Sequence, residues 1–251
     1  MIENPPVDLT LRIFVRSRAK LLGLLPILQS RTDVEIIEGK LTDREALMQC
    51  LNNSAAIFSC IATNQSEPGT SIATDTAAAI IDALHRARER TSASVSSWEK
   101  PLVVILSSAS VGEGYSGHPP APIYYIVQRA LHYLYEDLRQ TQQLYRDLGD
   151  RDPALLDFIF VQPPGIMPGE VPTGYRFSTD YAGGVVSFAD LGAGMVELAE
   201  RRNDFLGRGV SVIATGEVKQ DWRDNLKALV VGLLAYFLPW VWQAGKKLSL
   251  W

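Results

Sequence analysis

The sequence predicts an α/β fold built on a doubly wound, mainly parallel sheet. Two observations lead to this prediction. Short apolar runs rich in Val, Ile and Phe alternate along the chain with longer segments of helical period, which is the pattern of βαβ units. The runs PLVVILSS and LLDFIFVQ are strongly apolar, as in strands that helices cover on both faces. No internal repeat or linker interrupts the pattern, so we expect one domain over residues 1–251.

The expected strands are short β-branched or aromatic runs bounded by polar or turn-forming residues. In chain order they are Leu11–Val15, Val34–Ile37, Ala55–Ala62, Pro101–Ser108, Leu155–Gln162, Val185–Phe188 and Val210–Ala214. The third run, AAIFSCIA, is apolar enough to be covered on both faces.

Helices are expected between these strands. Thr42 is an N-cap candidate because Glu45 follows three residues later, which is a capping-box pattern. Residues 75–90 have helical period and a basic last turn that suits the helix dipole. One long helix is expected over about 123–148, and another begins with Asp190 at its cap.

Composition limits the function classes. The net charge is −4 and no basic stripe is visible, which argues against nucleic-acid binding. We interpret Cys50 and Cys60 as buried free thiols in a reducing compartment. The histidines have no ligand spacing, so no metal is expected. No signal peptide is evident at the N-terminus, and a cytoplasmic location is expected.

The longest apolar run, residues 228–242, allows two interpretations. It is shorter than the ~20 residues that cross a bilayer, and Pro239 interrupts it, so no transmembrane segment is expected. The run is either a C-terminal apolar helix packed on the domain, or a peripheral membrane contact made through Trp240, Trp242, Lys246 and Lys247.

The stretch GEGYSG, residues 112–117, has the G-x-G-x-x-G spacing of a dinucleotide-binding loop. Such a loop follows the first strand and opens directly into a helix whose N-terminus faces the diphosphate. Here the loop follows the fourth recognisable strand, and HPPAP comes next. We therefore expect a coincidence of spacing and a mobile loop beside a substrate pocket.

Several segments together resemble the atypical short-chain dehydrogenase/reductase family, in its NmrA-like branch. The likeness covers nearly the whole chain and resembles most the fungal members that serve aromatic polyketide pathways such as sterigmatocystin. Its segments are IFVRSRAKL, VEIIEGKLTD, IFSCIATN, VVILSSASV, FVQPPGI and VSFADLGAGMVE. The resemblance implies a Rossmann-like fold, with residues 160–251 contributing most of the substrate side.

Relative to that family, the sequence lacks an opening unit. Members begin with a strand, a glycine-rich turn and a helix, whereas Leu11–Val15 looks like their second strand. The missing strand is the central one, so its two neighbours would be left without a partner. We expect an incomplete version of a longer protein; the alternative is a repurposed fold.

The resemblance assigns residues to an NADP cofactor. Arg16, Arg18 and Lys20 follow the second strand of the family, where a basic turn pairs with a 2′-phosphate. Leu41 is assigned to the cofactor as well, and Ala62 and Thr63 end the strand beside its ribose and nicotinamide. Lys40 departs from the family, which often has an acidic residue at this place.

The catalytic assignment is less direct. Ser108 occupies the position of the serine that binds a substrate carbonyl or hydroxyl in the family. The usual proton donor, the tyrosine of Y-x-x-x-K, has no counterpart, because Tyr125 is followed by Arg129 and Tyr135 by Arg139. Tyr125 and Tyr135 remain as candidates, with aromatic packing as the alternative role of each.

The substrate pocket is expected at the carboxyl edge of the sheet, walled by Pro163, Pro164, Gly165 and the GEGYSG loop. The resulting prediction is an NADP-linked oxidoreductase for a hydrophobic aromatic polyketide-type intermediate in fungal secondary metabolism. Two alternatives stay open: a cofactor-independent cyclase, isomerase or dehydratase on the same fold, and a non-catalytic NmrA-like sensor. The sequence leaves the oligomeric state open.

Overall fold

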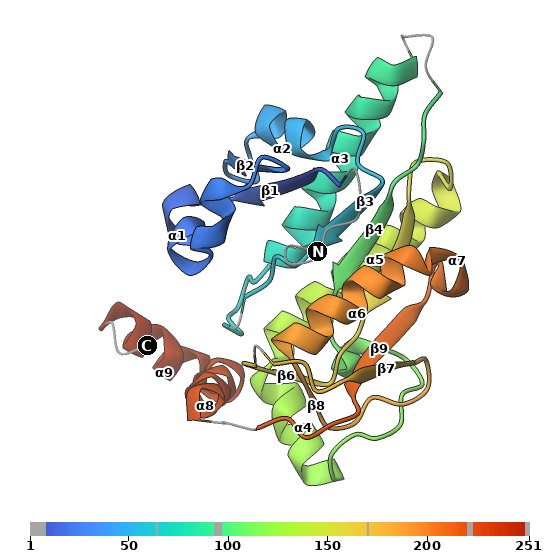
Figure 1. Ribbon diagram of the computed structural model, residues 1–251. Helices are drawn as coiled ribbons and strands as arrows, with labels where there is room; N and C mark the ends of the chain where they lie inside the picture. The colour runs from blue at the N-terminus through green and yellow to red at the C-terminus, as the bar shows by residue number, and fades with distance from the viewer. Residues whose placement is uncertain (1–8, 64, 93–96, 170, 220–222, 249–251) are drawn as a thin grey trace.

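The computed structural model describes residues 9–63, 65–92, 97–169, 171–219 and 223–248 (Figure 1). The strands are β1 (Leu11–Val15), β2 (Val34–Glu38), β3 (Ala56–Ser59), β4 (Leu102–Leu106), β5 (Asp157–Val161), β6 (Gly165–Met167), β7 (Tyr175–Ser178), β8 (Val185–Ser187) and β9 (Gly209–Ala214). The helices are α1 (Arg18–Leu24), α2 (Arg44–Leu51), α3 (Ile72–Ser92), α4 (Ala121–Ala130), α5 (His132–Arg151), α6 (Phe188–Glu200), α7 (Arg202–Phe205), α8 (Arg223–Phe237) and α9 (Pro239–Lys247), with 3₁₀ turns η1 (Pro26–Ser30) and η2 (Ala109–Val111).

The main sheet has five strands in the order β3-β4-β5-β9-β7. Its first four strands are parallel, and β7 adds an antiparallel edge. Two further parallel pairs, β1-β2 and β6-β8, lie outside this sheet. The prediction of a Rossmann-like, mainly parallel α/β fold is confirmed, and the short strands β6 and β7 were not anticipated.

The sheet is divided where the sequence suggested a missing strand. Among the described residues β1 pairs only with β2, and β3 pairs only with β4. The β1-β2 pair is held instead by side chains: Phe14 packs on the core, and Arg12 donates hydrogen bonds to the carbonyls of Cys50 and Asn52 at the end of α2. In the edge strand β3, Ile57 is buried in one hydrophobic cluster and Phe58 packs, partly buried, against the cluster on the opposite face, so the strand is covered on both faces but less completely than β4.

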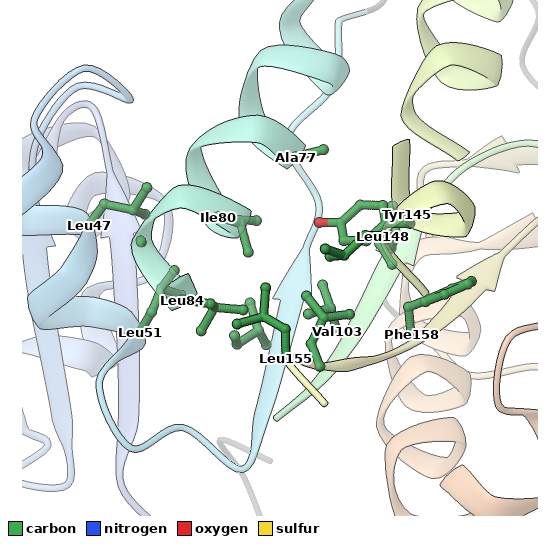
Figure 2. Packing of buried hydrophobic residues seen from close by; sticks show 14 of the residues in the cluster. Leu47, Leu51, Ala77, Ile80, Leu84, Val103, Tyr145, Leu148, Leu155 and Phe158 are labelled. Carbon is green, nitrogen blue, oxygen red and sulfur yellow. The ribbon is translucent and has the colours of Figure 1, made fainter. Parts of the chain in front are cut away.

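Helices cover both faces of the main sheet. Alternate residues of β4 point to opposite faces: Val103 and Ile105 join one hydrophobic cluster, and Leu102 and Val104 join the other. The first cluster lies between the sheet and helices α2, α3 and α5. Figure 2 shows Leu47 and Leu51 beside α3, with Tyr145 and Leu148 of α5 on the other side. The second cluster is closed by α6 (Figure 1).

Several helix boundaries differ from the predictions. Asp43, not Thr42, caps α2, because its carboxylate accepts a hydrogen bond from the N–H of Ala46 at 3.1 Å. Ser187 caps α6 in the same way and accepts from the N–H of Asp190 at 3.0 Å. The expected long helix is two helices that break at Leu131.

The C-terminal apolar run also forms two helices rather than one. Pro239 ends α8 and begins α9, where its missing N–H costs no hydrogen bond. Among the described residues no helix is long and apolar enough to cross a membrane.

The cysteines differ from each other. Cys50 is buried, as expected, whereas Cys60 is exposed because it follows the edge strand β3. Neither forms a disulfide bond.

Candidate active site

Ser108, Ser110 and Tyr135 form a hydroxyl cluster at the carboxyl end of β4. Ser108 caps the turn η2, and its hydroxyl accepts a hydrogen bond from the N–H of Ser110 at 3.2 Å. Tyr135 projects from the first turn of α5, and the side chains of Ser110 and Ser108 lie near enough to its hydroxyl to lower its pKa. The fold therefore brings two of the predicted catalytic residues, Ser108 and Tyr135, together.

The environment keeps the Tyr135 hydroxyl protonated. Its side chain is buried among Ala73, Val111 and Leu138. Burial raises the pKa of Tyr135, and the neighbouring side chains of Ser110 and Ser108 oppose that shift only in part. The nearby Arg139 also lowers this pKa and Tyr124 raises it. Burial is the largest of these effects, so the pKa of Tyr135 is raised overall. A tyrosine in this state is a neutral acid.

A second ring of polar groups surrounds the cluster. Gln128 on α4 donates hydrogen bonds to the carbonyl of Ser110 at 2.9 Å and to the hydroxyl of Tyr124 at 2.8 Å. Arg139 donates to the side-chain oxygen of Gln128 at 3.4 Å. These contacts join α4, α5 and the turn η2 into one network whose cation, Arg139, lies one helical turn after Tyr135.

The sequence analysis missed two buried glutamines that support this edge of the sheet. Gln142 donates to the hydroxyl of Ser107 at 2.9 Å, and Gln162 accepts from the hydroxyl of Tyr115 at 3.0 Å. Helical period offered a signal for the first, because Gln142 follows Tyr135 by seven residues, or two turns. No sequence signal pairs Gln162 with Tyr115.

The predicted substrate-side residues begin beside Ser108. The carbonyl of Pro163 accepts a hydrogen bond from the N–H of Ala109 at 2.9 Å, and Pro163 is buried. Pro164 and Gly165 are half-buried, and Gly165 begins β6. The loop after β5 is thus tied to the residue that follows the candidate catalytic serine.

The GEGYSG loop is packed against the protein rather than open. Tyr115 is buried, and its ring would clash with a Cβ at Gly112, which explains the glycine there. The N–H of Gly112 bonds the carbonyl of Ala109, and the N–H of Ser116 bonds that of Asp180. The N–H groups of Gly112 and Ser116 are therefore already hydrogen-bonded, and the first helix after the loop begins only at Ala121.

The other catalytic candidate, Tyr125, lies on a different surface. Its side chain is 53% exposed on α4, and the guanidinium of Arg129 lies 4.9 Å from its ring centre. Arg129 in turn donates a hydrogen bond to the hydroxyl of Tyr236 on α8. Within the described part of the chain, no hydrogen bond joins Tyr125 to Ser108.

The basic residues predicted for the cofactor cluster at the end of β1. Arg16, Arg18 and Lys20 are all exposed around the N-terminus of α1, which Ser17 caps by accepting from the N–H of Lys20 at 3.2 Å. The backbone N–H of Arg18 bonds the carboxylate of Glu38 at 3.2 Å, which links the ends of β1 and β2. Exposed cations at this place can meet a phosphate group.

The remaining predicted cofactor residues also follow strands. Leu41 comes after β2 and lines a cavity of about 440 Å³ between α2 and α3. Ala62 and Thr63 come after β3, where Ala62 is exposed and Thr63 half-buried. The described residues thus offer groups for the two ends of a dinucleotide, but they do not fit its diphosphate, because within them no glycine-rich turn joins β1 to a helix N-terminus.

A second cavity, of about 550 Å³, lies at β7 and shares no residue with the hydroxyl cluster. Arg201 in this cavity already pairs with Glu197 and Asp204, each at 3.1 Å. In the described chain no group of three or more His, Cys, Asp or Glu side chains could hold a metal ion. The hydroxyl cluster at β4 is therefore the candidate centre for chemistry.

Similar proteins identify the family of this chain. Averufin oxidase A from Aspergillus flavus is 37% identical over 237 residues, covering 92% of this chain and 82% of the relative. The oxidoreductase nsrR from Aspergillus novofumigatus is 33% identical over 246 residues, covering 96% and 89%. A short-chain dehydrogenase/reductase from Veillonella parvula, solved in complex with NADP, superposes with a TM-score of 0.61 at 17% identity over 83% of this chain and 84% of that one. Residues 6–202 match the NAD(P)H-binding family, to which this chain therefore belongs.

Proposed function

We propose that this protein is an oxidoreductase that uses NADP(H) and acts on a hydrophobic aromatic polyketide such as averufin, in fungal secondary metabolism. The observation that carries the proposal is the buried side chain of Tyr135, whose hydroxyl lies beside Ser108 and Ser110. Family membership supports the nicotinamide cofactor, and the name of the relative averufin oxidase A supports the substrate class.

The chemistry follows from the groups around Tyr135. Tyr135 carries a proton at neutral pH, as a tyrosine with an ordinary pKa of about 10 does, and can donate it to a substrate carbonyl oxygen. Burial raises the pKa of Tyr135 further, so donation depends on groups that stabilise the phenolate. Ser108 donates a hydrogen bond to the same oxygen and orients it. Arg139 lies close enough to lower the pKa of Tyr135, so it stabilises the phenolate left after transfer. NADPH, when bound, would supply the hydride.

The substrate side of this centre is assigned mainly to residues 160–251. The loop of Pro163, Pro164 and Gly165 begins there and is bonded to Ala109, one residue after Ser108. This loop would form the wall of the pocket nearest the reacting carbon.

The proton donor is tested by steady-state turnover of averufin with NADP(H). Tyr135→Phe should lower kcat by about 10²- to 10⁴-fold, as expected for loss of a general acid. Tyr133→Phe is the matched control on the same helix and should leave kcat unchanged. Tyr125→Phe decides between the two candidate tyrosines: if it alone abolishes turnover, the proton donor lies on α4 and this assignment is wrong.

Cofactor preference is tested by fluorescence titration with NADPH and NADH. If Arg16 and Arg18 bind a 2′-phosphate, replacing both with alanine should weaken NADPH binding by about 10²-fold or more, because each charge-assisted hydrogen bond contributes about 1.5–3 kcal/mol. NADH affinity should not change. Arg90→Ala, at an exposed arginine on α3, is the control. Equal loss for both cofactors would contradict a 2′-phosphate site.

One observation favours a second candidate. Ser108 and Tyr135 lie close together, whereas the described residues offer no diphosphate cradle, so a cofactor-independent cyclisation, dehydration or isomerisation at these two residues is the alternative. Turnover of the substrate in enzyme freed of nucleotide, with Tyr135→Phe inactive, would establish this alternative in place of the oxidoreductase.

A further inference from the structure

The corner between α8 and α9 presents four consecutive apolar residues to solvent. These residues, Phe237–Trp240, are called the apolar corner below. Phe237 is 54% exposed, Leu238 42% and Trp240 71%, and Pro239 is exposed as well. Large apolar side chains in solvent usually occur singly, so an unbroken run of four marks a contact surface.

The apolar surface continues along α8. Leu226 is 62% exposed and Val230 49%. With 3.6 residues per turn, these two residues and Phe237 lie within roughly 40° of one another around the helix axis. The opposite side of α8 packs on the protein: Ala235 is buried, and a Cβ at Gly232 would meet the carbonyl of Ala130 on α4. Leu226, Val230 and Phe237 therefore form an exposed apolar stripe along α8 that is continuous with the apolar corner.

The charge of this region is positive although the whole chain is negative. Residues 226–248 contain three lysines, Lys227, Lys246 and Lys247, and no Asp or Glu, whereas the chain has a net charge of −4. Lys246 pairs with Glu67 and lies 5.0 Å from the ring centre of Trp242. Trp242 is buried, so the expected contact of this residue with a membrane is wrong, and Trp240 is left as the exposed tryptophan of α9.

We propose that α8 and α9 dock on the surface of an anionic lipid bilayer, with the apolar corner inserted at the interface. Exposed aromatic and aliphatic side chains beside lysines are the chemistry of an interfacial helix. Anionic lipid also complements the lysines, whereas a second copy of this chain would bring the same lysines face to face. The proposal goes beyond the proposed oxidoreductase function and does not depend on it.

The test is co-sedimentation of the full chain with sucrose-loaded vesicles of phosphatidylcholine alone or with 30% phosphatidylserine. The protein should pellet with the anionic vesicles. Trp240→Ser should reduce the partition coefficient at least about tenfold, because a tryptophan carries 150–250 Å² of largely apolar surface. Val171→Ser, at an apolar residue that is 76% exposed elsewhere, is the matched control and should have no effect.

Charge is tested with Lys227→Gln and Lys247→Gln. Each substitution should weaken binding to the anionic vesicles about fivefold, because one lysine near such a surface contributes about 1 kcal/mol to the binding free energy. Binding to the neutral vesicles should not change. Circular dichroism confirms that each variant is folded. The proposal is overturned if the protein stays in the supernatant at millimolar lipid, or if Trp240→Ser pellets like the parent chain. It is equally overturned if light scattering shows a dimer that Trp240→Ser dissociates and that binds no lipid.

Discussion

Asp137 joins α5 to the beginning of α3, and removing its charge should destabilise the protein. The side chain is 1% exposed. Its two carboxylate oxygens accept hydrogen bonds from the backbone N–H groups of Ala73 and Thr74, each at 2.9 Å, and from the Thr74 hydroxyl at 2.7 Å. The carboxylate thus caps a helix from a position 63–64 residues away in sequence.

Asp137→Asn keeps the size of the side chain and changes only its charge and donors. One oxygen remains, but the new NH₂ group faces a backbone N–H, so one buried donor loses its partner. The lost charge-assisted hydrogen bond costs about 1.5–3 kcal/mol and the lost interaction with the helix dipole about 0.3–2 kcal/mol. We therefore expect the free energy of unfolding to fall by about 3 kcal/mol and Tm by about 6–12 °C.

Differential scanning calorimetry and urea unfolding measure these changes. Asp150→Asn makes the same substitution at an exposed aspartate on the same helix, and it should change the free energy of unfolding by less than about 0.5 kcal/mol. If the two variants have equal stability, the buried carboxylate does not hold the two helices together and the reasoning fails.

Three further predictions concern pH and packing. Burial alone would raise the pKa of Asp190, but hydrogen bonds from Ser187, Thr173 and Gly174 outweigh it and hold that pKa low, so its stabilisation is present above about pH 4 and is lost in acid. The free energy of unfolding, measured from pH 6 to pH 2, should depend less on pH in Asp190→Asn than in the parent chain. Burial and the bond to Glu197 raise the pKa of Tyr175 to about 12, so its contribution is complete below about pH 10 and declines as the pH rises toward that value. Tyr175→Phe should flatten that alkaline decline in the same assay. Gly39→Ala would place a Cβ 3.0 Å from the Phe14 ring and should cost about 1–3 kcal/mol in urea unfolding. Gly23→Ala, where no atom lies within 4 Å, should not destabilise the protein.

The buried strands of the main sheet could be predicted because their amino-acid composition is almost entirely apolar. Val103 and Val104 in β4 are fully buried on opposite faces, so the run containing them is apolar at every position rather than at alternate ones. The antiparallel strand β7 could not be predicted in the same way. It contains Tyr175, Arg176 and Ser178, and its pairing with β9 joins residues that are 33–39 positions apart in the sequence, from Ser178 with Ser211 to Tyr175 with Ala214.

The candidate site was predictable only in part. Ser108 and Tyr135 were identified from resemblance and spacing, but sequence alone gave Tyr125 equal standing. The choice depends on where α4 ends and α5 begins, because the break at Leu131 sets the direction of each tyrosine. Gln128 carries no sequence signal for catalysis, since a glutamine on a helix is usually a solvated surface residue, and the only signal for Gln142 is its spacing of seven residues from Tyr135.

The division of the sheet also has a dynamic consequence. The unit of β1, β2 and α2 is joined to the remainder by side-chain packing on α3 and by no strand-to-strand hydrogen bond among the described residues. Such a unit can open as a whole without unfolding the main sheet, so its amides should exchange with deuterium together and earlier than those of β4 and β5. The exposed arginines Arg16 and Arg18 belong to this unit, and any ligand that they hold would slow that shared exchange.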